Sequence, residues 1–281
     1  MGGIPFALHD HRLEVVRLDV ASAPHFVALG DAECGKTATL RCLARGLMAR
    51  HGPTELRLVV VAYRRTLLDL ASAPHCETYA YGPSLAAEAA EHLRTVLDRR
   101  LPGSAGQPAE APGSWWGTAP RYVLVVDDYD LVAAAGRNPL EPLLDLVTRG
   151  RDVGLHVLLA RPVSGTGRSS FEPVYQRVRE TGSPGLIMSG DPREGPLLGG
   201  QTATPQPPGR GYLVTRQGRS GLVQVAWTPP GPAAAGSPGP AAWTPPGPAA
   251  VATPGPQSSG HTGARGIGLA GPSRMSRSGP P

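Results

Sequence analysis

The chain has 281 residues, 40% of them hydrophobic, so it is long enough for one large domain or two small domains with a sizeable core. Its net charge is +5, yet residues 1–227 hold 24 basic and 22 acidic side chains and a net charge of only +2, which argues against a nucleic-acid-binding protein. A membrane-spanning or secreted protein is also not expected, because no apolar run approaches the roughly 18 to 20 residues that cross a bilayer and no signal-peptide pattern opens the sequence.

Apolar periodicity predicts a strand over residues 13–20 and a second strand over 25–29, which leads through a glycine-containing loop into a helix over 37–48. The elements expected after these are a strand at 56–63, a helix at 84–100 capped by Ser84, a strand at 121–127, a helix at 140–152, a strand at 154–160, a helix at 171–181, a strand at 185–189 and a hairpin of 211–216 with 221–226. Strands that alternate with helices in this way predict an α/β fold. We expect a RecA-like P-loop NTPase, with a mostly parallel sheet and helices on both of its faces.

The end of the chain differs in composition from the rest. Residues 228–281 contain 13 prolines, 11 glycines and no acidic residue, and the segment at 226–234 recurs at 242–250. Such a composition cannot bury enough apolar surface to fold, so we expect a domain at 1–227 followed by a disordered Pro/Gly-rich tail at 228–281. The repeated Trp-Thr-Pro-Pro units are either ligands for an aromatic-lined groove in a partner or the product of duplicated low-complexity DNA.

The loop after the second strand fits the phosphate-binding pattern G-x-x-x-x-G-K-[ST]. Lys36 in this loop is the only lysine among 27 basic residues, and a compact ammonium on a flexible stem suits a loop wrapped around phosphates better than a guanidinium does. We expect Lys36 to reach the β- and γ-phosphates of ATP and the Thr37 hydroxyl to hold Mg²⁺. The predicted nucleotide-binding residues are Gly30, Asp31, Ala32, Glu33, Cys34, Gly35, Lys36 and Thr37.

The three cysteines Cys34, Cys42 and Cys76 show no metal-ligand spacing, which indicates reduced thiols. Cys34 lies close to Lys36 and to the start of a helix, two features that lower the pKa of a thiol. It is therefore either partly thiolate and sensitive to oxidation, or an ordinary small loop residue.

A second chemical landmark is the apolar run at 122–126 that ends in Asp127 and Asp128, which is typical of a Walker B strand. A buried central strand delivers a carboxylate to the sheet edge where α/β proteins bind ligands, so Asp127 is predicted to hold Mg²⁺ together with Thr37. Asp128 is the candidate catalytic base for the attacking water. Many NTPases of this layout carry Glu at that position, and the shorter side chain of Asp predicts slow or absent hydrolysis.

Arg161 ends the predicted strand at 154–160, where a residue that senses the γ-phosphate often lies. Arg149 and Arg151 are either arginine fingers for the nucleotide of a neighbouring subunit or plain surface residues. His156, inside the strand, fits a hydrogen-bonded core histidine better than a catalytic base.

Several segments in order resemble the FtsK/SpoIIIE-type ATPase domains of EccC, the ATPase of actinobacterial type VII (ESX) secretion. They are the loop at 30–37 and the segments at 126–130, 150–157, 182–191 and 195–199. The resemblance covers about 4–227 and is greatest to the last domain of the tandem array in EccC.

This resemblance implies a RecA-like fold, bound ATP and Mg²⁺, and docking of small helical secreted proteins of the WXG type. It also implies other ATPase domains or subunits of the secretion motor as partners, no DNA, and a cytoplasmic location at the inner face of the cell membrane through those partners. Two alternatives stay open: an FtsK-like DNA-translocating ATPase, and a degenerate module in which ATP only stabilises an assembly.

Overall fold

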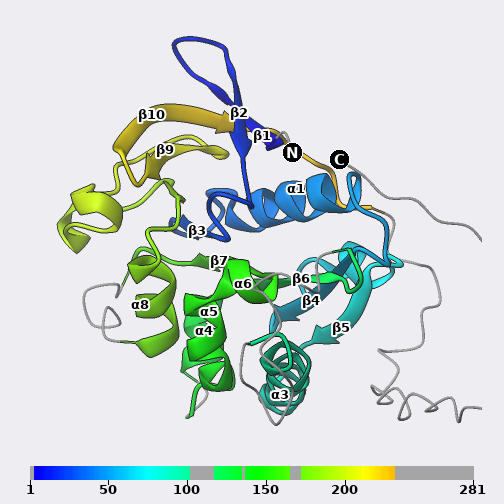
Figure 1. The fold of residues 1–281 in the computed structure, drawn as a ribbon. Coiled ribbons are helices and arrows are strands. Elements are labelled where there is room, and N and C mark those ends of the chain that lie inside the picture. Colours follow the sequence, from blue (N-terminus) through cyan, green and yellow to red (C-terminus); the bar gives the residue numbers. More distant parts are fainter. Residues whose placement is uncertain (1–2, 102–116, 135–136, 165–171, 232–281) are drawn as a thin grey trace, which may run out of the picture. The chain divides into compact units, whose positions relative to one another are not determined.

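A computed structural model describes residues 3–101, 117–134, 137–164 and 172–231. Within these ranges, ten strands form one sheet in the order β2-β1-β10-β9-β8-β3-β7-β6-β4-β5 (Figure 1). The strands are β1 (Ile4–His9), β2 (Val15–Leu18), β3 (His25–Leu29), β4 (Leu56–Ala62), β5 (Cys76–Ala80), β6 (Arg121–Asp127), β7 (Leu155–Arg161), β8 (Gly185–Ile187), β9 (Arg210–Thr215) and β10 (Gly218–Val225). The helices are α1 (Lys36–Met48), α2 (Leu68–Ala71), α3 (Pro83–Asp98), α4 (Tyr129–Ala133), α5 (Leu144–Thr148), α6 (Gly150–Val153) and α8 (Pro173–Glu180). No helix in the described ranges is long and apolar enough to cross a membrane.

The sheet has a parallel part and an antiparallel extension. Strands β8, β3, β7, β6, β4 and β5 pair in parallel, whereas β9, β10, β1 and β2 continue the sheet with antiparallel pairing. Every residue of β3 and β7 is buried, as expected of central strands that are covered on both faces. The carboxyl ends of the parallel strands therefore meet at one edge, the place where α/β sheets bind ligands.

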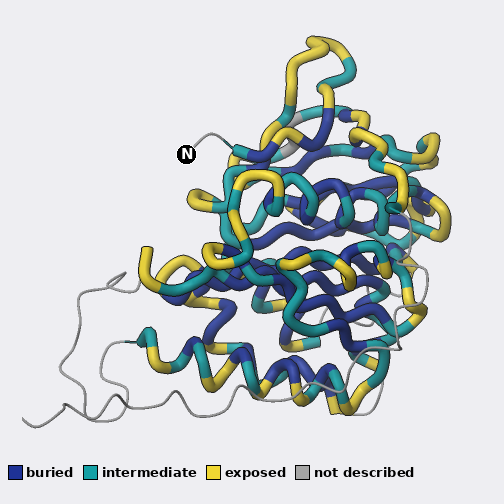
Figure 2. Tube along the Cα trace, turned by 90° about the vertical axis from the view of Figure 1, so that its right-hand side faces the viewer, coloured by how far each residue is buried: buried dark blue, intermediate teal, exposed yellow. Residues whose placement is uncertain are grey.

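Helices cover both faces of this sheet, and a separate hydrophobic core lies on each side. Helix α1 packs over one face, against side chains of β4 and β6 that point to that face. Helices α3, α5 and α8 pack over the other face (Figure 1). In Figure 2 the buried residues are concentrated in the sheet and on the inner sides of the helices. The predicted fold class, a mostly parallel α/β sheet with helices on both faces, is confirmed.

Two local expectations about secondary structure are wrong, and two strands were not predicted. Ser84 is not the cap of α3, because Gly82 takes that position and Pro83, whose fixed φ suits the first turn of a helix, follows it. The helix expected at 140–152 is divided into a 3-10 turn (Glu141–Leu143), α5 and α6. Strands β1 and β5 were not predicted, because β1 contains a proline and β5 has few apolar residues.

The predicted tail at 228–281 lies almost entirely outside the described residues. Its first four residues run beside α1, where Arg45 Nη1 donates to the carbonyl of Pro229 at 2.8 Å.

Candidate nucleotide-binding site

The loop that joins β3 to α1 adopts a conformation that its two motif glycines permit. Gly35 has φ 106°, and a Cβ there would lie 3.2 Å from both the Gly209 nitrogen and Met188 Cε. A Cβ at Gly30 would lie 2.4 Å from Cys34 Sγ. A Cβ at Gly30 would collide with Cys34, and a Cβ at Gly35 would be strained by the left-handed backbone, so the glycines of the motif have a steric cause in this fold.

Backbone hydrogen bonds fix the loop to neighbouring strands. The Asp31 N–H donates to the carbonyl of Ser189 at 2.8 Å, and the Gly209 N–H donates to the carbonyl of Cys34 at 2.8 Å. The exposed loop residues Ala32 and Glu33 lie at the tip, and Glu33 has a left-handed φ of 59°. The segment after β8 and the segment before β9 thus both hold the loop in place at the start of α1.

Helix α1 begins at Lys36 and has no acidic residue in its first turn, so its N-terminus is suited to an anion. The Lys36 ammonium lies over the loop, where Nζ donates to the carbonyl of Asp31 at 2.7 Å. Lysine, helix N-terminus and loop amides are therefore assembled around one point.

Asp127 at the end of β6 is the centre of the second half of the site. Its Oδ2 accepts hydrogen bonds from the hydroxyls of Thr37 and Thr66, each at 2.7 Å. The side chain is 1% exposed, and Oδ1 has no hydrogen-bond partner in the described part of the chain. A buried carboxylate oxygen without a partner costs free energy, and a hard divalent cation is a natural ligand for it, so Asp127 and Thr37 fit Mg²⁺.

Asp128, the predicted base, follows in the left-handed conformation with φ 48° and ψ 53°. Burial, and next the charge of Asp127, raise the pKa of its carboxyl above the usual value, whereas Arg64 and Lys36 act in the opposite direction. Arg64 Nε lies 3.6 Å from Asp128 Oδ2. Asp128 therefore lies beside the other site residues, but an arginine faces its carboxylate.

A polar network begins at Tyr129, the residue that follows Asp128. The hydroxyl of Tyr129, a buried residue, donates to Glu172, and Asn138 Nδ2 donates to Tyr129 at 2.8 Å and to Glu172 Oε1 at 2.5 Å. Glu172 also caps α8 by accepting from the N–H groups of Val174 and Tyr175. This network ties the turn at Asp128 to α8.

The segment after β4 contributes site residues that the sequence did not predict. Thr66 bonds to Asp127 and Arg64 pairs with Asp128, while the hydroxyl of Tyr79 donates to the Thr66 carbonyl at 2.5 Å. Arg65 and Leu67 have left-handed φ values of 56° and 59°. The available signal was topological: the segment follows an apolar run, and β4 neighbours β6 in the sheet.

Other residues singled out from the sequence lie elsewhere. The Arg161 guanidinium stacks 4.6 Å from the ring centroid of Tyr175, so its side chain packs on α8, and a role as phosphate sensor stays a prediction. Arg149 and Arg151 are exposed near the amino end of β7, and their role as arginine fingers also stays a prediction. His156 is a buried core residue as expected, although its Nε2 has no partner among the described residues.

The interpretation of Cys34 as partly thiolate is wrong. The residue is 3% exposed, and burial raises the pKa of its thiol above the usual value despite the nearby Lys36. Its Sγ lies 3.8 Å from Met188 Sδ, so it is a packed residue beneath the loop.

Residues 5–102, which include the phosphate loop and β4, match the model of the FtsK/SpoIIIE family. The chain contains an FtsK/SpoIIIE domain. The chain is 40% identical over 224 residues to the ESX secretion system protein EccC of Thermomonospora curvata and 41% identical over 227 residues to the ESX-4 secretion system protein EccC4 of Mycobacterium tuberculosis. These matches cover 80% and 81% of this chain but only 17% and 18% of the relatives, so the chain spans less than a fifth of their length.

Solved structures of EccC are also similar to this chain. The cytoplasmic domain of Thermomonospora curvata EccC superposes with a TM-score of 0.75 at 40% identity, over 81% of this chain and 26% of that one. A structure of ATPases 2 and 3 of the same EccC, in complex with a signal sequence peptide, has a TM-score of 0.74 over 81% of this chain and 41% of that one. The resemblance to EccC ATPase domains that the sequence motifs indicate is thereby confirmed.

Proposed function

We propose that this FtsK/SpoIIIE domain binds ATP and Mg²⁺ as a module of a type VII secretion ATPase and hydrolyses ATP slowly or not at all. The observation that carries the proposal is the meeting of Lys36, Thr37 and Asp127 at one sheet edge, with Asp127 Oδ1 buried and without a partner in the described residues. Loop amides and Lys36 would bind the phosphates, and Thr37 and Asp127 would hold the cation. Bound Mg²⁺ would neutralise phosphate charge.

The proposal of weak hydrolysis has two supports in the residues themselves. Asp128 is one methylene shorter than Glu, and its carboxylate faces Arg64 at 3.6 Å. A base must reach the proton it removes, and a carboxylate that faces an arginine is held away from the attacking water. ATP binding and ATP hydrolysis thus depend on different residues of this site.

We further propose that the domain docks small helical secreted proteins of the WXG type and works beside other ATPase domains or subunits of the motor. The support is the similarity to Thermomonospora curvata EccC, whose ATPases 2 and 3 bind a signal sequence peptide. Titration of the full chain with labelled C-terminal peptides of WXG-type proteins encoded beside its gene tests this proposal. Saturable binding supports it, and no binding of any such peptide contradicts it.

Nucleotide binding is tested with Lys36→Ala and Lys36→Arg in a fluorescent ATP titration of the full chain. Both variants should lose at least about tenfold in affinity, because one charge-assisted contact with phosphate is worth about 1.5–3 kcal/mol and a guanidinium does not fit the loop. Arg50, an exposed residue beyond the end of α1, provides a matched control as Arg50→Ala. Unchanged affinity of Lys36→Ala contradicts the proposal.

Asp128→Glu tests the explanation for weak hydrolysis. The longer side chain should raise the steady-state turnover above that of the wild type, because it extends the carboxylate toward the water, and Asp128→Asn should show no increase. Phosphate release is the measurement. A turnover of Asp128→Glu no higher than that of the wild type would sink the reach argument.

The DNA-translocating alternative is tested by salt-dependent DNA binding. Phosphate contacts strengthen steeply as salt falls, so a translocase should bind DNA at low ionic strength. The net charge of +2 on residues 1–227 leads us to expect no binding there.

A further inference from the structure

The β1–β2 hairpin carries three exposed apolar side chains, Leu8, Leu13 and Val15, which we call the hairpin knob. Their exposed fractions are 46%, 74% and 50%, and they are three of the five large exposed apolar side chains among the described residues. Leu8 and Val15 lie opposite each other in the β1–β2 register, so they share one surface beside the turn. The hairpin projects from the body of the domain (Figures 1 and 2). Large apolar side chains gathered on one exposed hairpin indicate a contact surface.

The backbone at Leu13 strengthens this interpretation. Its φ is 52°, and the turn is closed by bonds from Leu13 N to the His9 carbonyl at 2.8 Å and from His9 N to the Glu14 carbonyl at 2.9 Å. A left-handed position in a hairpin loop normally holds Gly or Asn, because a Cβ there clashes with the backbone. Leucine at this place is strained and also exposed, so burial inside the domain does not compensate the strain. Strain of this kind concentrates at functional contacts.

The hairpin knob is held in a defined place. The Asp10 N–H donates to the Leu222 carbonyl at 2.9 Å, and the Asp10 carboxylate pairs with Arg210. These contacts anchor the turn to β9 and β10. An apolar group held in this way loses little conformational freedom when it binds.

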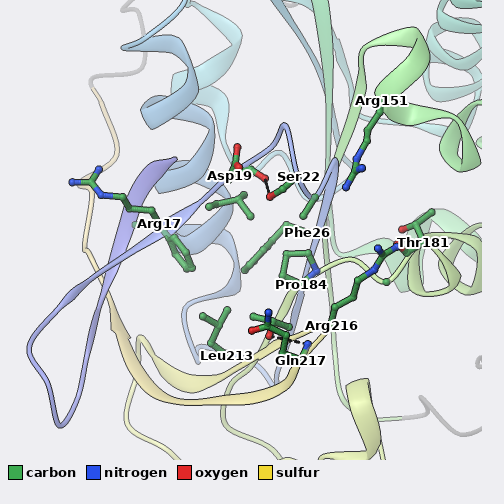
Figure 3. A pocket seen from close by; sticks show the side chains of 15 residues that line it. Arg17, Asp19, Ser22, Phe26, Arg151, Thr181, Pro184, Leu213, Arg216 and Gln217 are labelled. Atoms are coloured by element: carbon green, nitrogen blue, oxygen red, sulfur yellow. Dashed lines mark hydrogen bonds between the residues drawn. The ribbon is translucent and has the colours of Figure 1, made fainter. Parts of the chain in front are cut away.

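A pocket of about 480 Å³ lies at the amino ends of β3 and β8, and we call it the amino pocket (Figure 3). Its apolar lining includes Phe6, Leu18, Phe26, Pro184 and Leu213. Its polar lining includes Asp19, Ser22, Arg151, Thr181 and Arg216. In Figure 3 the Arg151 side chain extends from α6 toward the pocket, whereas Arg17 points away from it. The pocket lies at the opposite end of β3 from the phosphate loop, so it is separate from the nucleotide site.

We propose that the hairpin knob of one copy of this chain inserts into the amino pocket of another copy. Leu13 and Val15 would bury their side chains against the apolar lining, and Glu14 between them would face Arg151 on the rim. Glu14 already pairs with Arg12, but at 3.8 Å with both side chains 67% exposed, and such a solvated pair is readily exchanged. Arg12 in turn has Asp19 as a counter-charge on the rim. Apolar area and charge thus match on both sides of the contact.

The contact forms between copies because the fold keeps the hairpin knob from its own amino pocket. Strand β2 runs from Val15 beside the turn to Leu18, which lines the pocket, and an extended strand separates residues by about 3.3 Å each. Since the hairpin knob and the amino pocket are different surfaces, the contact joins two copies reciprocally or continues head to tail into a ring.

The test is sedimentation of the full chain over a range of concentrations, with Leu13→Gly as the first variant. Glycine removes the apolar side chain and also the strain at φ 52°, so the variant should be at least as stable as the wild type yet associate about tenfold or more weakly. Leu68→Ala, which truncates an exposed leucine on α2, is the matched control and should associate normally. Wild-type association by Leu13→Gly, or a wild type that stays monomeric at millimolar concentration, overturns the proposal.

A second variant, Arg151→Glu, tests the amino pocket. It should also associate weakly. In an equimolar mixture, the hairpin knob of the Arg151→Glu chain should bind the amino pocket of the Leu13→Gly chain, so one of the two contacts is regained. Combining it with Glu14→Arg in one chain should restore association by exchanging the charges. If Arg151→Glu weakens association while Leu13→Gly does not, a segment other than the hairpin knob fills the pocket and the proposal is wrong. ATP affinity measured in parallel should be unchanged in Leu13→Gly, so failure here is distinguishable from failure of the nucleotide proposal.

Discussion

Thr66 offers the sharpest test of how the site is built. Its hydroxyl is one of two that donate to Asp127 Oδ2, each at 2.7 Å. If the Thr37 hydroxyl held a cation, Thr66 would be the donor that keeps Asp127 oriented. Thr66→Val removes this hydroxyl with little change of shape, and the bond from Tyr79 to the backbone carbonyl of residue 66 is retained.

The magnitude follows from the bond that is lost. A hydrogen bond to a charged group contributes about 1.5–3 kcal/mol, which corresponds to a factor of about 10 to 100 in an equilibrium constant. Removal of a group that orients a metal ligand lowers metal affinity by a similar factor of about 10 to 100. We therefore expect Thr66→Val to weaken Mg²⁺-dependent ATP binding by about that factor.

The assay is a calorimetric titration of the full chain with ATP in the presence of Mg²⁺ and again with a chelator. Thr66→Ser retains the hydroxyl and should bind like the wild type, and circular dichroism should show that both variants are folded. In the chelator, Thr66→Val and the wild type should bind with equal affinity. If Thr66→Val binds Mg²⁺-ATP as tightly as the wild type, Thr66 does not position Asp127 and the reasoning fails.

Two further predictions concern the loop and the core. Gly35→Ala should destabilise the fold by about 1–3 kcal/mol and weaken ATP binding, because φ at Gly35 is 106° and a Cβ would press on Gly209. The control is Gly52→Ala, since the nearest atom to a Cβ at Gly52 is 4.0 Å away. It should change neither the melting temperature nor the affinity for ATP. Burial lowers the pKa of His25 to about 4 and of His156 to about 3, so the unfolded chain takes up protons below pH 6.5 that the folded chain does not. The free energy of unfolding should therefore fall as the pH drops from about 6.5 to 4, by up to roughly 1.4 kcal/mol per pH unit for each histidine, and His156→Gln should remove about half of that slope in urea titrations. Equal stability at pH 7 and pH 5 would contradict the histidine argument.

The main elements of the fold could be predicted from local patterns, because buried central strands are continuous apolar runs. The runs at 25–29, 56–62 and 121–127 became β3, β4 and β6. Elements whose sequence lacks such a pattern were missed. Strand β5 is Cys-Glu-Thr-Tyr-Ala, and pairing with β4 rather than its own composition makes it a strand.

The sequence by itself was enough to predict the phosphate-binding loop, because the motif is contiguous and its glycines, lysine and threonine lie within eight residues of one another. It also determined the family resemblance and the acidic end of β6. Only the tertiary structure brought Thr66 and Arg64 to Asp127 and Asp128, since the order of strands in the sheet, and not distance along the chain, sets which carboxyl ends are neighbours. The tertiary structure also decided that Arg161 stacks on Tyr175, that burial raises the pKa of Cys34, and that the hairpin knob is exposed. Burial and stacking depend on which residues pack against a side chain, and the local sequence does not specify them.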